Sequence, residues 1–340
     1  MSRWIIDSPT TLDFDGVVAL RVRIVAGSVA VLATADRPRI EVNEVSGQPL
    51  LVTHEAGILT VSYEDLTWEG LRGWLRPKRH SANITIMVQK DCPTQLGVVN
   101  ATAIVSGVSA RTSLKSVSGD MTLDGVTGAV DANTVSGNIE AQGLEGHVIF
   151  RSVSGDLTLA DGCVGRLDAR TVNGGLTADV ALAPTGEMRV TTLSGDVAIR
   201  LPAGTDARVD LRSASGQMRS DFDPLTSAGD PGSKTMAGTL GGGSGKLSVS
   251  TMSGDVTILQ GSQREGPCDA AASGPEETAA AGSAETATTS PAKTATTSPA
   301  DAAAYGRAET AKASPADAAA ADPETAVMGT GGSTKEGEAR

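Results

Sequence analysis

A short motif returns seven times between residues 116 and 258, and this repetition constrains the fold more than any other feature of the chain. Each copy joins Ser or Thr to a Ser-Gly or Asn-Gly turn and then to alternating apolar residues, as in residues 152–159 (SVSGDLTL). The copies are 18, 18, 19, 21, 21 and 38 residues apart. A spacing near 20 residues is typical of one β-solenoid coil, and the last interval covers about two coils. The motif glycines are Gly119, Gly137, Gly155, Gly174, Gly195, Gly216 and Gly254.

Residues before each motif alternate between apolar and polar, which is the period of a strand with one buried face. Val130, Ala132 and Thr134 show this alternation. Val135 follows Thr134 directly and the alternation resumes at Ile139, so the phase shifts by one residue and the chain must turn a corner. We expect the motif glycine to supply a positive φ at that corner. We also expect the aliphatic residues, the motif valines included, to stack out of solvent as the core.

The remaining segments complete the predicted architecture. A second short turn recurs between motifs, so each coil holds at least two strands. Residues 1–110 also alternate as strands and are expected to cap the first coil. Beyond residue 260 there is no Leu, Ile, Phe or Trp, and such a segment cannot offset the entropy of ordering. We therefore predict an all-β, parallel β-solenoid or β-helix-like fold with an N-terminal β cap (1–110), solenoid repeats (111–260) and a disordered Ala/Thr/Pro-rich tail (261–340).

Composition agrees with a solenoid and limits the partners. Aromatic residues make up 2% of the chain, whereas a globular enzyme of 340 residues packs many more. The net charge of −12 disfavours binding to nucleic acid phosphates. Cys92, Cys163 and Cys268 have no CxxC or Cys/His spacing and are expected to be incidental thiols, which suits a reducing compartment. The first residues hold no signal-peptide apolar core, and no stretch suits a membrane span, so we expect a cytoplasmic protein, with peripheral membrane association as the variant.

No pattern in the sequence indicates an enzyme. His54, His80 and His147 are the three histidines, and none is paired with a motif-spaced Cys or carboxylate. Stacked aspartates could hold a hard cation such as calcium, but Asp after Ser-Gly is ordinary turn chemistry and the series is interrupted. We therefore expect no catalytic residue, cofactor, metal or small-molecule substrate. The aspartates of the series are Asp120, Asp156, Asp196 and Asp255.

A tryptophan-rich basic segment at residues 68–80 (WEGLRGWLRPKRH) stands apart from the repeats. Tryptophan beside arginine and lysine could contact an anionic membrane surface or a protein partner. The alternative is a hairpin folded back over the edge of the cap. The candidate contact residues are Trp68, Leu71, Arg72, Trp74, Arg76, Lys78 and Arg79.

The serial motif (S/T)-V-S-G-(D/N)-(I/L/V)-x-(L/A) resembles the bacterial adhesin-like β-strand-repeat domain of unknown function, related to the toastrack domains, over about residues 10–260. The resemblance implies a right-handed parallel β-solenoid-like fold, no established catalysis, and in some relatives a link to envelope-stress sensing or surface attachment. It supplies no catalytic residues.

These observations favour a non-enzymatic scaffold or interaction protein that associates with itself through the coil ends, because uncapped strand edges pair. The alternative is a membrane-proximal or envelope-stress sensor that uses the tryptophan-rich segment. A carbohydrate-active β-helix enzyme is the second alternative. It is disfavoured because the acidic residues lie at turns rather than clustered on a strand face.

Overall fold

The computed structural model of the chain describes residues 2–63, 80–230, 233–262 and 268. All of them belong to one unit, Met1–Thr278. The described residues form 22 β-strands and no helix, so the predicted all-β fold is confirmed. The predicted tail and the tryptophan-rich segment lie outside the described residues, apart from Gly261, Ser262 and Cys268 of the tail and His80 of the segment. The boundaries drawn at residues 110 and 260 stay a prediction.

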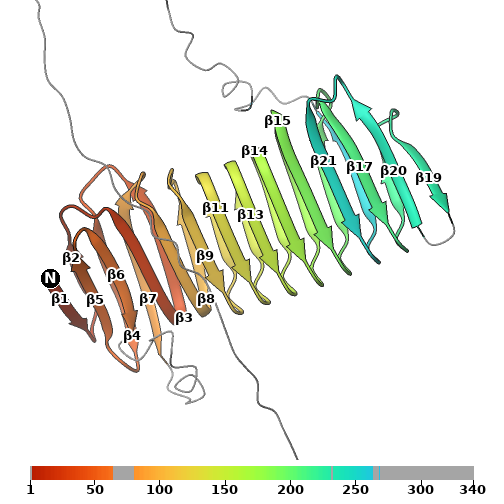
Figure 1. Ribbon diagram of the computed structural model, residues 1–340. Coiled ribbons are helices and arrows are strands. Elements are labelled where there is room, and N and C mark those ends of the chain that lie inside the picture. Colours follow the sequence, from red (N-terminus) through yellow and green to blue (C-terminus); the bar gives the residue numbers. More distant parts are fainter. Residues whose placement is uncertain (1, 64–79, 231–232, 263–267, 269–340) are drawn as a thin grey trace, which may run out of the picture. The chain divides into compact units, whose positions relative to one another are not determined.

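The strands stack as two faces that we call face A and face B, joined at two corners in every coil (Figure 1). Face A holds, in spatial order, β2 (Thr10–Asp13), β4 (Arg39–Ser46), β7 (Ser81–Gln89), the second halves of β3 (Ala19–Thr34) and β8 (Thr94–Ser106), β10 (Met121–Asp124), β12 (Ile139–Gln142), the first halves of β14 (Leu157–Thr171) and β15 (Leu176–Thr192), β16 (Val197–Pro202), β22 (Val256–Gly261) and β18 (Met218–Ser220).

Face B repeats the arrangement on the other side of the core. It holds β1 (Ser2–Ile6), β5 (Leu50–Glu55), β6 (Ile58–Tyr63), the first halves of β3 and β8, β9 (Thr112–Ser116), β11 (Thr127–Thr134), β13 (Glu145–Ser152), the second halves of β14 and β15, β21 (Gly245–Thr251), β17 (Ala207–Ser213), β20 (Ser233–Leu240) and β19 (Thr226–Asp230).

Parallel pairing continues from β6 and β3 to the last coils, and antiparallel strands cover both ends. At the N-terminal end β1 and β5 continue face B, and β2 and β4 continue face A. At the other end the β19–β20 hairpin pairs antiparallel with β17. The predicted N-terminal cap is thus confirmed as β structure, and the C-terminal end has a hairpin cover on face B that the repeat pattern does not indicate.

The core is a set of inward rows that run from coil to coil. In one such row of face B, Phe150 lies in register between Ala132 and Ala169, and all three are buried. The large ring fits because both neighbours are small. The period-2 alternation read from the sequence is confirmed in each coil by strands whose buried and exposed residues alternate.

The last coils do not follow each other in chain order, contrary to the simple interpretation of the motif spacing. Strand β21 pairs with β15 on one side and with β17 on the other, although β17 comes earlier in the chain (Figure 1). In the same way β22 lies between β16 and β18. The spatial order of the motif glycines is therefore Gly195, Gly254 and then Gly216. The position between β15 and β17 is therefore occupied by β21, which comes later in the chain than β17.

Candidate functional site: the motif corner and its exposed apolar ladder

Each motif forms a tight corner that is closed by its own buried hydroxyl. The Ser or Thr at the first motif position accepts a hydrogen bond from the backbone N–H of the motif glycine three residues later. In the third copy the Ser152 hydroxyl lies 2.7 Å from the Gly155 nitrogen. Six of the seven copies make this bond, through Ser116, Thr134, Ser152, Thr192, Ser213 and Thr251.

The motif glycines are required for a different reason than the predicted positive φ, and that prediction is wrong. None of the seven is among the residues of positive φ. Instead, a Cβ atom on Gly155 would lie 2.0 Å from the carbonyl oxygen of Gly137 in the preceding coil. Every motif glycine meets such a carbonyl, so the corner leaves no room for a side chain. Positive φ occurs at the second corner, for example at Gly125 and Gly143.

The aspartates after the glycines form hydrogen bonds to neighbouring coils. The Asp120 carboxylate accepts a hydrogen bond from the backbone N–H of Asn138 at 2.8 Å. The Asn138 side-chain oxygen in turn accepts a hydrogen bond from the backbone N–H of Asp156. The same bond joins Asp196 to the backbone N–H of Asp255. These carboxylates cap backbone N–H groups of the next coil, as turn aspartates commonly do.

One copy of the motif supports a direct test of the corner hydrogen bond. The Thr171 hydroxyl is buried without a hydrogen-bond partner, whereas the Thr192 hydroxyl accepts from Gly195 at 3.0 Å. Thr192→Val should lower the free energy of unfolding by about 1.5 kcal/mol, because it leaves a buried N–H unsatisfied. Thr171→Val should change it by less than about 0.5 kcal/mol, since no bond is lost. Urea denaturation of both variants checks this, and equal losses would contradict it.

Three of the four motif valines, Val135, Val153 and Val172, are exposed and Val117 is partly exposed, so the expectation that they lie out of solvent is wrong. The phase shift at the corner turns the second and third motif residues outward, while the first motif residue and the motif glycine stay buried. Val153 is 47% exposed, and its carbonyl accepts the backbone N–H of Asn173 in the next coil at 2.8 Å. Equivalent bonds connect the whole series, so these residues follow each other coil by coil. The exposed apolar ladder comprises Val135, Val153, Val172, Leu193 and Met252.

Neutral and paired groups border the exposed apolar ladder. The serine row beside it donates hydroxyl hydrogen bonds to the carbonyls of the preceding coil, as Ser136 does to Val117 at 3.2 Å. On face B the nearest arginines are paired within the solenoid, as Arg170 is with Asp168 at 3.0 Å. The ladder is therefore an uncharged apolar stripe on an acidic protein. The phase shift was the sequence signal that could have revealed it.

One hollow in the described part of the chain is much smaller than a usual ligand pocket. A hollow of about 60 Å³ is lined by Asp179, Arg200, Pro202, Gly261 and Ser262. A usual ligand pocket has a volume of roughly 300 Å³ or more. No group of three or more His, Cys, Asp or Glu suited to a metal ion occurs in the part of the chain that the structure describes.

The other residues considered in the sequence are spread over the molecule. The His54 ring packs 5.8 Å from Phe14, the His80 ring packs 5.2 Å from Tyr63, and His147 is exposed on β13. Trp68, Leu71, Arg72, Trp74, Arg76, Lys78 and Arg79 lie outside the described residues. No helix long and apolar enough to cross a membrane is found in residues 2–63, 80–230 and 233–262.

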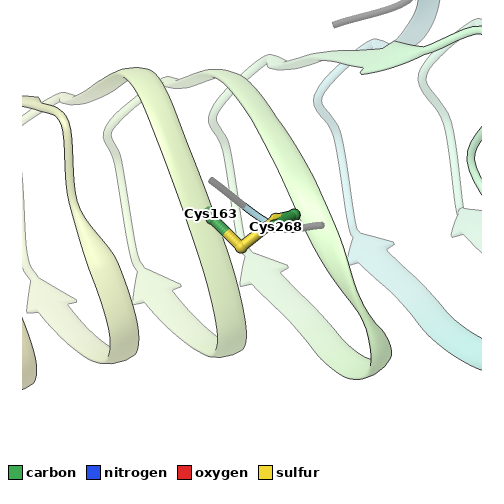
Figure 2. The surroundings of a disulfide bond; sticks show 2 residues. All are labelled: Cys163 and Cys268. Atoms are coloured by element: carbon green, nitrogen blue, oxygen red, sulfur yellow. A yellow bond between two sulfur atoms is a disulfide. The ribbon is translucent and has the colours of Figure 1, made fainter. Parts of the chain in front are cut away.

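Two of the three cysteines are bonded, which corrects the expectation of incidental thiols. Cys163, in β14, forms a disulfide with Cys268, 105 residues later (Figure 2). Cys92 is free and buried. Burial, followed by the charge of Asp91, raises the pKa of its thiol to about 11. The sequence did not indicate the disulfide because the spacing of its cysteines fits no disulfide framework.

Three solved structures are similar to the chain at low identity. A candidate cell adhesion protein from Clostridium sporogenes shares 12% identity over 75% of this chain and 99% of its own, with a TM-score of 0.20. Two proteins from Parabacteroides distasonis, a candidate lipid-binding protein and a candidate adhesin, share 10% and 12% identity over 75% of this chain and 97% and 96% of their own. Their TM-scores are 0.34 and 0.37.

No curated protein matches the chain. The family model of the toastrack DUF4097 domain matches residues 78–259, which span the described coils from β7 to β22 and all seven motif corners. Because the match covers more than half of the 340 residues, the chain belongs to the toastrack DUF4097 family.

Proposed function

We propose that the protein is a non-enzymatic interaction protein that associates with a second copy of itself through the exposed apolar ladder. The observation that carries the proposal is the ladder itself. Five successive coils each expose a large aliphatic side chain by 44–58% at one corner. Water-exposed apolar side chains that adjoin one another along a surface mark a contact site more than scattered ones do.

A second copy is the partner that best fits the spacing of the ladder. Neighbouring strands lie about 4.8 Å apart, so the four steps from Val135 to Met252 cover about 19 Å. Another copy of this solenoid presents the same side chains at the same interval. Two ladders that run in opposite directions therefore meet rung by rung, with the same patch used on both molecules.

The charge of the chain also bears on the contact. At a net charge of −12, two copies repel each other, and the uncharged ladder is where they can approach most closely. Salt screens this repulsion, so self-association should strengthen as the salt concentration rises. A contact with a basic partner would weaken instead.

The ladder is a better place for self-association than the coil ends that the sequence suggested. On face B the last parallel strand is covered by the β19–β20 hairpin, and on face A the last strand, β18, has only three residues. Short and covered edges are the usual means by which proteins avoid strand pairing. We therefore place the proposed contact on the side of the solenoid.

Sedimentation velocity of the full chain tests the proposal. Five partly exposed side chains provide less area than the roughly 800 Å² per partner of a stable interface, so we expect a weak dimer with Kd above about 1 μM. The double variant Val153→Lys with Val172→Lys should raise Kd at least about tenfold, because it places like charges opposite each other. The matched control, Ile5→Lys with Val18→Lys, changes two exposed apolar residues of the cap by the same charge.

Three outcomes would contradict the proposal. The first is a wild type that is monomeric at all concentrations. The second is a ladder variant that dimerises as the wild type does. The third is a cap control that loses dimerisation while the ladder variant keeps it. Co-sedimentation with anionic vesicles is the parallel arm. Binding that depends on the ladder there would mean a lipid partner instead of a second copy.

The cytoplasm remains the proposed compartment. The thiol state of the protein in cells tests this proposal, as described below.

A further inference from the structure

The disulfide joins the start of the C-terminal segment to the side of the solenoid. Cys163 lies at the second corner of its coil, where face A passes into face B, opposite the motif corner. Cys268 follows β22, the last strand among the described residues, by seven residues. The 72 residues from 269 to 340 therefore continue from a residue bonded to the middle of the stack.

The bond joins Cys268, which follows β22 in the chain, to a coil that lies several strands away from β22. On face A, β22 is three strands away from β14, with β15 and β16 between them. Three strand spacings are about 14 Å along the stack. The described strand β22 ends at Gly261. Cys268 is bonded at the coil of Cys163 (Figure 2).

The burial of Cys163 indicates that the disulfide packs closely against the solenoid. The residues in register with Cys163 on the two neighbouring coils, Glu145 and Ala181, are partly exposed. Cys163 itself is only 7% exposed. The row is therefore open to solvent except at the coil where the disulfide is located.

We propose that Cys163 and Cys268 form a redox-controlled tether that fixes the root of the C-terminal segment to the solenoid. Opening requires two electrons and two protons. Two molecules of a low-molecular-weight thiol supply them, and the products are two protein thiols and one small-molecule disulfide. Closure is the reverse, with a small-molecule disulfide as oxidant. The solenoid does not depend on the bond, because all coils are joined by backbone pairing on both faces.

The tether and the exposed apolar ladder lie at opposite corners of the coil, so the two proposals are independent. Oxidation fixes the root of the segment on the side away from the ladder. A failure of the self-association test leaves the tether proposal untouched, and the reverse also holds.

Counting reactive thiols in the folded full chain tests the tether. Cys92 is an internal silent control, since it is 2% exposed and its thiol pKa is raised to about 11. With a maleimide reagent at neutral pH we expect no rapid label on the oxidised protein and two labels after millimolar glutathione. Cys268→Ser should give one label in both conditions, and Cys92→Ser should behave as the wild type.

Peptide mapping identifies the bond directly. A non-reduced tryptic digest of alkylated, denatured protein should link residues 152–166 to residues 265–293, and reduction should separate them. Two rapid labels on the air-oxidised protein would overturn the proposal, because no tether would exist. A bond that millimolar glutathione cannot open in the folded protein would also overturn it, because the disulfide would then be a permanent link.

Acid-quenched alkylation in the host cell completes the test. A cytoplasmic chain should be reduced at rest and at least half oxidised after a diamide pulse. Full oxidation at rest would contradict the switch and the cytoplasmic location together, while the self-association proposal would stand.

Discussion

Gly174→Ala is expected to destabilise the solenoid strongly, whereas Gly175→Ala, one residue later, is expected to be tolerated. A Cβ atom on Gly174 would lie 2.2 Å from the carbonyl oxygen of Gly155 and 2.9 Å from the Thr171 hydroxyl. Two coils would have to separate to accept it. The loss of unfolding free energy should be about 3 kcal/mol or more, at the upper end for overpacking.

Gly175 supplies the matched control because it has the same residue type in the same turn. Its Cβ would meet the nearest atom, an Asp156 carboxylate oxygen, at 3.5 Å, which is ordinary contact. Gly175→Ala should change the unfolding free energy by less than about 1 kcal/mol, since Gly→Ala at a compatible φ also reduces the entropy of the unfolded chain. Urea denaturation followed by circular dichroism measures both variants. Similar urea midpoints for the two variants would show that Gly174 is not required for the close approach of the coils.

Phe150→Ala is expected to cost about 3–5 kcal/mol of unfolding free energy, which makes it the other large effect. The Phe150 ring is 1% exposed and lies in register between Ala132 and Ala169. Two alanines cannot fill the space that the ring leaves, and the strand spacing fixed by backbone hydrogen bonds prevents the coils from closing over it.

Val153→Ala is the control for Phe150→Ala. Val153 follows in the next corner of the same coil but is 47% exposed, so its removal should cost less than about 1 kcal/mol. Denaturant midpoints of the two variants give the comparison, because a stack of coils need not unfold in a single step. If both substitutions cost the same, the row of Phe150 is not the tightly packed core that the structure describes.

The repeat explains why so much of the coil could be predicted. The inward alternation could be predicted because the face-B strands of the repeats bury every second residue, as β11 and β13 do. The corner could be predicted because the phase shifts between Thr134 and Ile139. The role of the corner glycine was not readable. Its cause is a carbonyl in another coil, and local sequence carries no signal of a contact with residues 18 to 59 positions away.

The candidate site was partly readable from the same pattern. The shift of phase that predicts the corner also turns Val135 outward, but the preference of valine for buried strands suggested the opposite. At this corner the exposure of a side chain depends on its position in the coil and not on whether the residue is apolar. That is the physical reason why an apolar stripe can run along an otherwise polar edge.

The amino-acid sequence by itself determined the elements of this protein: short strands, their inward faces, the corners and the period. It could do so because these depend on residues adjacent in the chain. Only the tertiary structure decided that β21 and β22 lie between coils that precede them in the chain, that a hairpin covers β17, and that Cys268 returns to Cys163. Parallel coils offer nearly identical strand edges, so the choice among them depends on packing over the whole stack.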